Sequence, residues 1–124
     1  MRYGTAKHAM ICKTYVISNP YRLSNRFLAA VFLLSRNMET WKRAKKAITD
    51  DRIDFKRIPK IGLDPYQYSI VCAAQDIYED TRHITLYDIG DAYLMEGDLF
   101  DLIINALQIC KKGYDGIGVK KRFN

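Results

Sequence analysis

Lysine and arginine are the residues whose type and spacing most clearly suggest chemistry in this chain. Eight of them fall within residues 41–60, WKRAKKAITDDRIDFKRIPK, which begins with the only tryptophan. Clustered cations of this kind can neutralise phosphate groups or an acidic protein surface. Alternatively, they only keep the outer face of a helix in water. The predicted binding residues are Lys42, Arg43, Lys45, Lys46, Arg52, Lys56, Arg57, Lys60, Lys120, Lys121 and Arg122.

Histidine and cysteine are too few and too scattered to predict a metal site. His8 precedes Cys12 by four residues, but structural zinc usually takes four nitrogen or sulfur ligands in paired short spacings. No CxxC pair is present, so in a reducing compartment each cysteine is expected to be a small buried side chain. The cysteines are Cys12, Cys72 and Cys110. We therefore expect no metal and no cofactor.

The sequence contains no recognisable catalytic motif. A GxSxG nucleophile elbow is missing, and the acids of residues 76–101 fall where helix caps and outward helix faces are expected. In GYDGIGVKK at 113–121, the lysine is displaced from its place in a phosphate-binding loop and no Ser or Thr follows it. A non-enzyme is therefore predicted. A catalytic site assembled only in three dimensions, around His83 and the acids of 76–91, stays open as an alternative.

Residues 84–108 have the spacing of a helix-turn-helix motif, with Gly97 near the turn. The second helix begins GDLFDLIINAL, which contains Asp98 and Asp101 and no Lys or Arg. Phosphates would repel these acids, and the arginine that usually reads guanine is missing. Direct nucleic-acid binding would therefore depend on the basic residues of 42–60 and on the KKR tail.

The elements that must position these residues are mostly helices. Their starts are marked by N-cap residues, and apolar residues recur at helical spacing within them. Asp98 is expected to cap the last helix. The helices are expected at 23–36, 38–48, 65–78, 86–95 and 99–110.

Two further segments complete this prediction. Residues 9–17, AMICKTYVI, are rich in β-branched and aromatic side chains and predict a strand. The connection after residue 48 contains apolar residues that are expected to pin it to the core as a short strand or one helical turn. We therefore predict a mainly α fold, a single-domain bundle of four to five helices that includes a short N-terminal strand.

The predicted helix at 38–48 is amphipathic. At 100° per residue, Trp41 falls on its apolar side, and the cations lie on the opposite side. Trp41 is therefore expected to point inward, and Lys42, Arg43 and Lys46 are expected to face solvent.

Length and composition are those of one globular domain. The chain has 124 residues, of which 48% are hydrophobic and 27% charged, so it can bury an independent core. The N-terminus lacks the apolar segment of a signal peptide. The longest apolar run, Phe27–Leu34, is far shorter than the roughly 20 residues of a membrane-spanning helix. We expect a soluble cytoplasmic domain over residues 1–124, with a flexible basic tail at about 114–124.

Charge is distributed unevenly along the chain. Residues 1–48 contain ten Lys or Arg and one acid, whereas residues 64–110 contain one Arg and nine acids. The formal net charge of the whole chain is +6. Such asymmetry is typical of polyanion-binding surfaces, but it also allows two halves of one fold to attract each other.

One resemblance to known proteins can be described. The run AVFLLSRNMETWKRAKKAI at 30–48, followed by DLFDLIINALQI at 98–109, resembles an uncharacterised bacterial family of small single-domain helical proteins. In that family an apolar helix ends in a short Ser-x-Asn turn before the next helix. The resemblance implies an all-helical core and no known activity, so no functional residue is transferred from it.

The sequence therefore predicts a small non-catalytic binding or regulatory protein that acts on a macromolecular partner. The expected partner is an acidic protein surface or a nucleoprotein complex, as for an inhibitor or regulator from a mobile element. Nine tyrosines in 124 residues also favour a contact surface. The first alternative is direct nucleic-acid binding through the basic helix, and the second is an enzyme whose site is not visible in the sequence.

Overall fold

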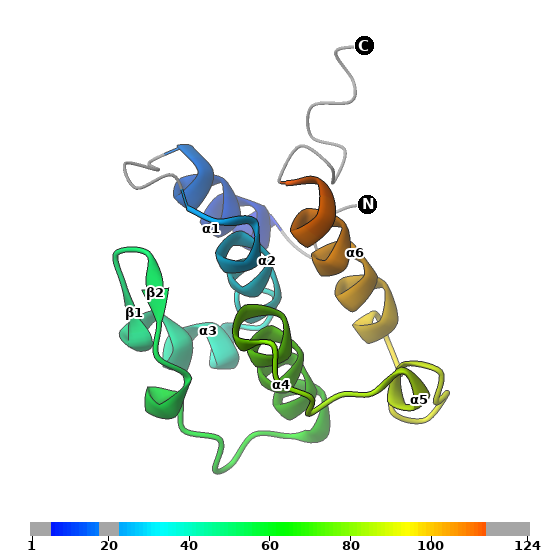
Figure 1. Cartoon of the computed structure of the whole chain (residues 1–124). Coiled ribbons are helices and arrows are strands. Elements are labelled where there is room, and N and C mark those ends of the chain that lie inside the picture. Colours follow the sequence, from blue (N-terminus) through cyan, green and yellow to red (C-terminus); the bar gives the residue numbers. More distant parts are fainter. Residues whose placement is uncertain (1–5, 18–22, 114–124) are drawn as a thin grey trace.

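The fold is a mainly helical single domain, shown in Figure 1 as a computed structural model that describes residues 6–17 and 23–113. Its centre is helix α2 (Asn25–Leu34), which packs against both α4 (Pro65–Glu79) and α6 (Leu99–Lys112). Helix α1 (Ala6–Ile17) lies on another side of α2. The predicted fold class is confirmed, although the N-terminal strand is not.

Helix α2 is central because its sequence is apolar on every side. All residues from Ala29 to Leu34 are buried, together with Phe27. The Oγ atom of Ser24 accepts a hydrogen bond of 3.1 Å from the Phe27 amide and so caps the helix. A helix without a polar face must be covered by other elements, and this requirement sets the arrangement of the fold.

The predicted strand at 9–17 is wrong, because these residues belong to helix α1. The β-branched residues of this segment suggested a strand. In the structure, His8 and Cys12 are four residues apart and both are buried. A polar histidine and a cysteine mark the buried face of this helix, so the periodicity is not visible in a pattern of aliphatic residues. Contact with α2 outweighs the local preference.

The predicted helix at 38–48 is shorter than expected. Helix α3 (Met38–Ala44) is followed by a 3₁₀ turn, η1 (Lys45–Ala47). A hairpin then forms from β1 (Ile48–Thr49) and β2 (Arg52–Ile53), and a second 3₁₀ turn, η2 (Phe55–Arg57), follows it. The small sheet of the described residues is therefore in the middle of the chain, in the connection that was expected to hold a short strand or one helical turn.

Helix α4 begins as expected, with Asp64 as N-cap. Its carboxylate accepts a hydrogen bond from the Gln67 amide, and the Gln67 side chain accepts one from the Asp64 amide. The helix ends at Glu79, and its C-cap residue Asp80 has a left-handed φ of 59°. Within the described ranges, no helix is both long and apolar enough to cross a membrane.

The predicted helix at 86–95 forms only in its first turn. Helix α5 (Leu86–Ile89) begins with a capping box between Thr85 and Asp88, and Gly90 is its C-cap residue. Turns occupy most of the chain from there to α6. Figure 1 shows α5 at the edge of the molecule, away from the packed helices.

Candidate functional site

Five of the predicted binding residues are exposed on three neighbouring elements, and we call this set the basic face. They lie on η1, β2 and η2: Lys45, Lys46, Arg52, Lys56 and Arg57. The two 3₁₀ turns are in contact, and the Asp54 amide donates a hydrogen bond of 2.9 Å to the Ala47 carbonyl. The hairpin thus brings together cations that are up to twelve positions apart in the sequence.

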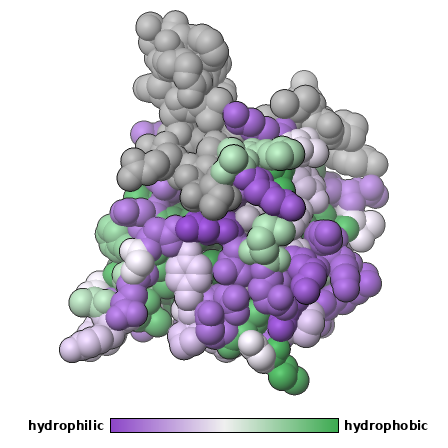
Figure 2. All heavy atoms as spheres, turned by 180° about the vertical axis from the view of Figure 1, so that it is seen from behind, coloured by the Kyte–Doolittle hydropathy of each residue, from purple (hydrophilic) through white to green (hydrophobic). Residues whose placement is uncertain are grey.

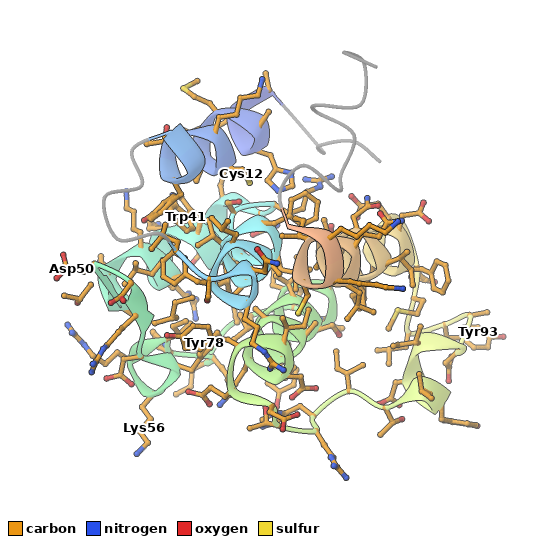
Figure 3. All side chains as sticks on the ribbon, turned by 45° about the horizontal axis from the view of Figure 1, so that its top comes forward. Cys12, Trp41, Asp50, Lys56, Tyr78 and Tyr93 are labelled. Carbon is orange, nitrogen blue, oxygen red and sulfur yellow. The ribbon has the colours of Figure 1, made fainter. Side chains whose placement is uncertain are left out.

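Apolar side chains hold the basic face to the helical bundle. Ile53, Phe55 and Ile58 are buried beneath it. The Ile53 amide donates a hydrogen bond of 3.3 Å to the Tyr78 hydroxyl on α4, and the Phe55 and Tyr78 rings lie 5.9 Å apart. Figure 3 shows Tyr78 inside the molecule and Lys56 pointing away from it. The backbone that carries these cations is therefore anchored to the helical bundle.

The cations of the basic face have no acidic partners among the described residues. The ion pairs found there join Arg36 to Asp98, Lys42 and Arg43 to Glu39, and His83 to Asp76. Three carboxylates nevertheless lie within the same segment. Asp50 and Asp51 form the tip of the hairpin, and Asp54 precedes η2. The surface is thus cationic with interspersed acids.

Arg43 differs from the expectation that it faces solvent, since only 19% of its side chain is exposed. Its Nε atom donates a hydrogen bond of 2.8 Å to Glu39. Its Nη1 atom donates to the carbonyls of Pro59 and Ile61, at 2.9 and 2.7 Å. Arg43 therefore fixes the connection before α4. The four-residue spacing between Glu39 and Arg43 is the sequence signal that predicts their ion pair.

The remaining predicted binding residues lie outside the basic face. Lys42 is exposed, with its Nζ atom 3.6 Å from Glu39. Lys60 is half-buried, and its Nζ atom lies 5.9 Å from the centroid of the Tyr68 ring, a cation–π contact. Trp41 is 7% exposed, which confirms that it points inward. The tail residues Lys120, Lys121 and Arg122 are outside the described residues.

A second exposed surface surrounds α5, and we call residues 84–97 the lobe. Leu86, Tyr87 and Tyr93 are 86%, 82% and 89% exposed. The lobe also contains the acids Asp88, Asp91 and Glu96. The tyrosine content predicted a contact surface, but the sequence did not show which tyrosines are exposed, because the expected helix 86–95 would have turned some of them inward.

Asp76 organises the connection between α4 and the lobe. It accepts hydrogen bonds from the Thr81 hydroxyl, the amides of His83 and Ile84, and Nδ1 of His83, all between 2.7 and 2.8 Å. Burial opposes ionisation of this carboxyl group, but the hydrogen bonds outweigh it and hold its pKa below the ordinary value. The structure thus brings together His83 and an acid of the 76–91 segment. These hydrogen bonds give the Asp76 carboxylate a structural role, which is to stabilise the loop at residues 81–84.

His8 and Cys12 both have partners on α2. His8 Nε2 donates a hydrogen bond of 2.7 Å to the Phe32 carbonyl, and Cys12 Sγ lies 3.4 Å from Ser35 Oγ. Burial lowers the pKa of His8 to about 4 and raises the pKa of Cys12 to about 12. In the described part of the chain, no group of three or more His, Cys, Asp or Glu side chains is placed to hold a metal ion. Both residues are thus accounted for by packing.

The other two cysteines behave as small apolar side chains to different degrees. Cys72 is buried, as the sequence predicted, whereas Cys110 is half-buried at the edge of the core. Burial is the main cause that raises the pKa of Cys72. A raised thiol pKa disfavours the thiolate, which is the nucleophilic form.

Comparison with known proteins adds no functional assignment. The chain matched no protein-family model, no curated protein and no solved structure. The resemblance of residues 30–48 and 98–109 to a bacterial helical family therefore stays a prediction. The basic face and the lobe are the two surfaces from which function can be argued.

Proposed function

We propose that the protein is a non-catalytic binding protein that regulates a partner protein by docking its basic face on an acidic surface of that partner. The observation that carries this proposal is a set of five exposed cations without acidic partners in the described residues. They lie on a hairpin strand and its two flanking 3₁₀ turns, beneath which apolar side chains are buried. A fixed support reduces the conformational entropy that is lost when such a surface binds.

The acids within the basic face favour a protein partner over nucleic acid. Asp51 at the hairpin tip, and Asp54 beside η2, would be repelled by a continuous phosphate backbone. A protein surface with charges of both signs can pair with this pattern, and such pairing mainly sets specificity and association rate. In addition, buried Trp41 cannot stack on a base, which removes a common source of affinity for single strands.

A charge-reversal experiment tests the proposal. The face variant carries Lys45→Glu, Lys46→Glu and Lys56→Glu, and the control variant carries Lys7→Glu, Lys13→Glu and Arg82→Glu. All six side chains are exposed, and the two variants have the same net charge. Partners captured by the tagged wild-type chain from its host are identified, purified and titrated with each variant.

We expect the wild type and the control to bind the purified partner with similar affinity. The face variant should lose at least an order of magnitude in affinity, because each new glutamate repels the acidic surface. Equal binding of the face variant would exclude the basic face. Capture of nuclease-sensitive nucleic acid, with affinity that falls steeply with salt, would support direct nucleic-acid binding instead.

A further inference from the structure

The lobe exposes three large side chains, Leu86, Tyr87 and Tyr93, which we call the patch. Leu86, Tyr87 and Tyr93 are each more than four-fifths exposed. Other highly exposed hydrophobic residues, such as Ile61 and Met10, belong to other segments of the chain. On the face shown in Figure 2, much of the surface is hydrophilic. Exposure of three large side chains to water within one short segment is unfavourable unless a partner covers them, so the patch points to a binding partner.

The charge around this patch is opposite to that of the basic face. Asp88, Asp91 and Glu96 belong to the lobe, and between residues 64 and 110 Arg82 is the only Lys or Arg. Asp88 accepts a hydrogen bond from the Thr85 amide, and Asp91 accepts hydrogen bonds from the amides of Tyr93 and Leu94. The patch therefore fits a partner surface that is basic.

The two complementary surfaces cannot meet within one molecule. Figure 1 shows the hairpin and α5 on opposite sides of the packed helices, and Figure 3 shows Lys56 and Tyr93 at opposite ends of the molecule. The hairpin is bonded to α4 through the Ile53 amide and the Tyr78 hydroxyl, and the lobe is bonded to α4 through the Ile84 amide and Asp76. Contact between them requires a second chain.

We infer that the lobe docks on the basic face of a second copy of this chain, head to tail. This inference rests on the proposed function only in taking the basic face as a docking surface. The contact is heterologous, so each added copy leaves one free lobe and one free face, and association continues beyond a dimer unless a ring closes. The patch is small, which makes the association weak and dependent on concentration.

Self-association of this kind would regulate partner binding. A basic face covered by the lobe of another copy is not available to an acidic partner, so the partner and the second copy compete for Lys45, Lys46 and Lys56. Dilution or capture by the partner releases the monomer. The acidic surface of the partner would then bind the same lysines as the lobe does.

The test is sedimentation velocity of the full chain at low ionic strength over a wide range of concentrations. Besides the face variant, a lobe variant carries Leu86→Ser, Tyr87→Ser and Tyr93→Ser. Among the described residues none of these three side chains forms a hydrogen bond, so the fold should be retained. Met10→Ser with Met38→Ser, two exposed residues of other helices, is the control.

We expect the wild type and the control to form dimers and larger species as concentration rises, and added salt to reverse this. Each variant alone should stay monomeric. An equimolar mixture of the two variants should form dimers and nothing larger, because each molecule keeps one working surface and the two surfaces are complementary.

A wild type that stays monomeric at every concentration would overturn the inference, as would a lobe variant that associates like the wild type. Neither result affects the proposed function, which is judged by affinity for the purified partner. Conversely, the mixture can form dimers even if the face variant binds that partner normally. The experiments can therefore contradict the self-association without contradicting the proposed function, and the reverse.

Discussion

His8 is a buried imidazole whose free energy depends on pH. Its side chain is 1% exposed in the contact between α1 and α2. Burial lowers its pKa from 6.5 to about 4; the Phe32 hydrogen bond raises the pKa, and Arg36 lowers it further. Asp98 raises it as well, but burial decides the direction. The folded chain therefore holds this histidine neutral.

The free energy of unfolding should consequently fall as the pH decreases from 6.5 towards about 4. In this window the unfolded chain binds a proton that the folded chain does not, and the full loss is about 3 kcal/mol. Urea unfolding at a series of pH values measures it. His8→Gln keeps a donor for the Phe32 carbonyl and should flatten the curve. An unchanged pH dependence in this variant would assign the effect to other groups.

The contribution of Asp76 to the pH dependence of stability can be distinguished from that of His8, because the two groups act in different pH ranges. Its hydrogen bonds hold the carboxyl pKa below the ordinary value, so its contribution is present above the unfolded pKa and is lost only as the pH falls through the lower folded pKa. That window lies below the range in which the unfolded His8 titrates.

Arg43 should matter for stability more than the other cations of its helix. Arg43→Ala removes three hydrogen bonds and leaves the Pro59 and Ile61 carbonyls without this donor, so we expect a loss of about 1–3 kcal/mol. Lys42→Ala removes only an exposed contact with Glu39 and should have little effect. Chemical denaturation of both variants makes the comparison. Equal stabilities of the two variants would show that water replaces Arg43 as the donor to the Pro59 and Ile61 carbonyls without loss of free energy.

At the scale of the elements, Asp98 joins three helices. Its carboxylate accepts hydrogen bonds from Arg36 beyond α2, at 2.8 Å, and from the Tyr66 hydroxyl in α4, at 2.5 Å. Burial, followed by this hydrogen bond, raises the pKa of Tyr66. Asp98 forms no side-chain cap on α6, although it occupies the N-cap position. The carboxylate thus connects the ends of the central helices.

A double-mutant cycle should detect this connection. Tyr66→Phe removes one hydrogen bond and should cost about 1 kcal/mol, whereas Asp98→Ala removes both partners' acceptor and should cost about 2 kcal/mol. In the Asp98→Ala background, Tyr66→Phe should have almost no further effect. Additive losses in thermal or urea unfolding would mean that the two side chains act independently.

Asp98 also illustrates what the sequence could and could not predict. An acid before an apolar helical stretch is correctly read as a helix start, and α6 begins at Leu99 as expected. The true partners of its carboxylate are 62 and 32 positions away, and no local pattern contains that information. The same limit explains α1, whose buried face is defined by contact with α2.

The candidate site also has some features that the sequence could predict and others that it could not. The cations of residues 42–60 and the inward direction of Trp41 could be predicted, because composition and helical period are local properties. The separation of Arg43 from the basic face could not, because its acceptors are main-chain carbonyls at positions 59 and 61. The exposure of Tyr93 could not be predicted either, because this residue lies beyond the early end of α5 at Ile89.

For the whole molecule, the segregation of charge is the property that most constrains behaviour. The basic face and the acidic lobe lie on opposite sides of the bundle (Figure 1), which makes the molecule strongly polar. Attraction between unlike ends acts over about 10 Å at moderate ionic strength and is screened beyond that distance. Salt should therefore weaken both partner binding and self-association, while leaving the apolar core largely unaffected.

The way the lobe is attached has an implication for how this fold can change. Two carboxylates, Asp76 and Asp98, hold the ends of the segment, and both act from outside residues 84–97. Inside it, Leu86, Tyr87 and Tyr93 contribute little to the core. Ile89 and Met95, in contrast, pack against the core. Substitutions at Leu86, Tyr87 and Tyr93 can therefore accumulate without loss of folding. The lobe is the part of this chain in which a new binding specificity could evolve or be grafted.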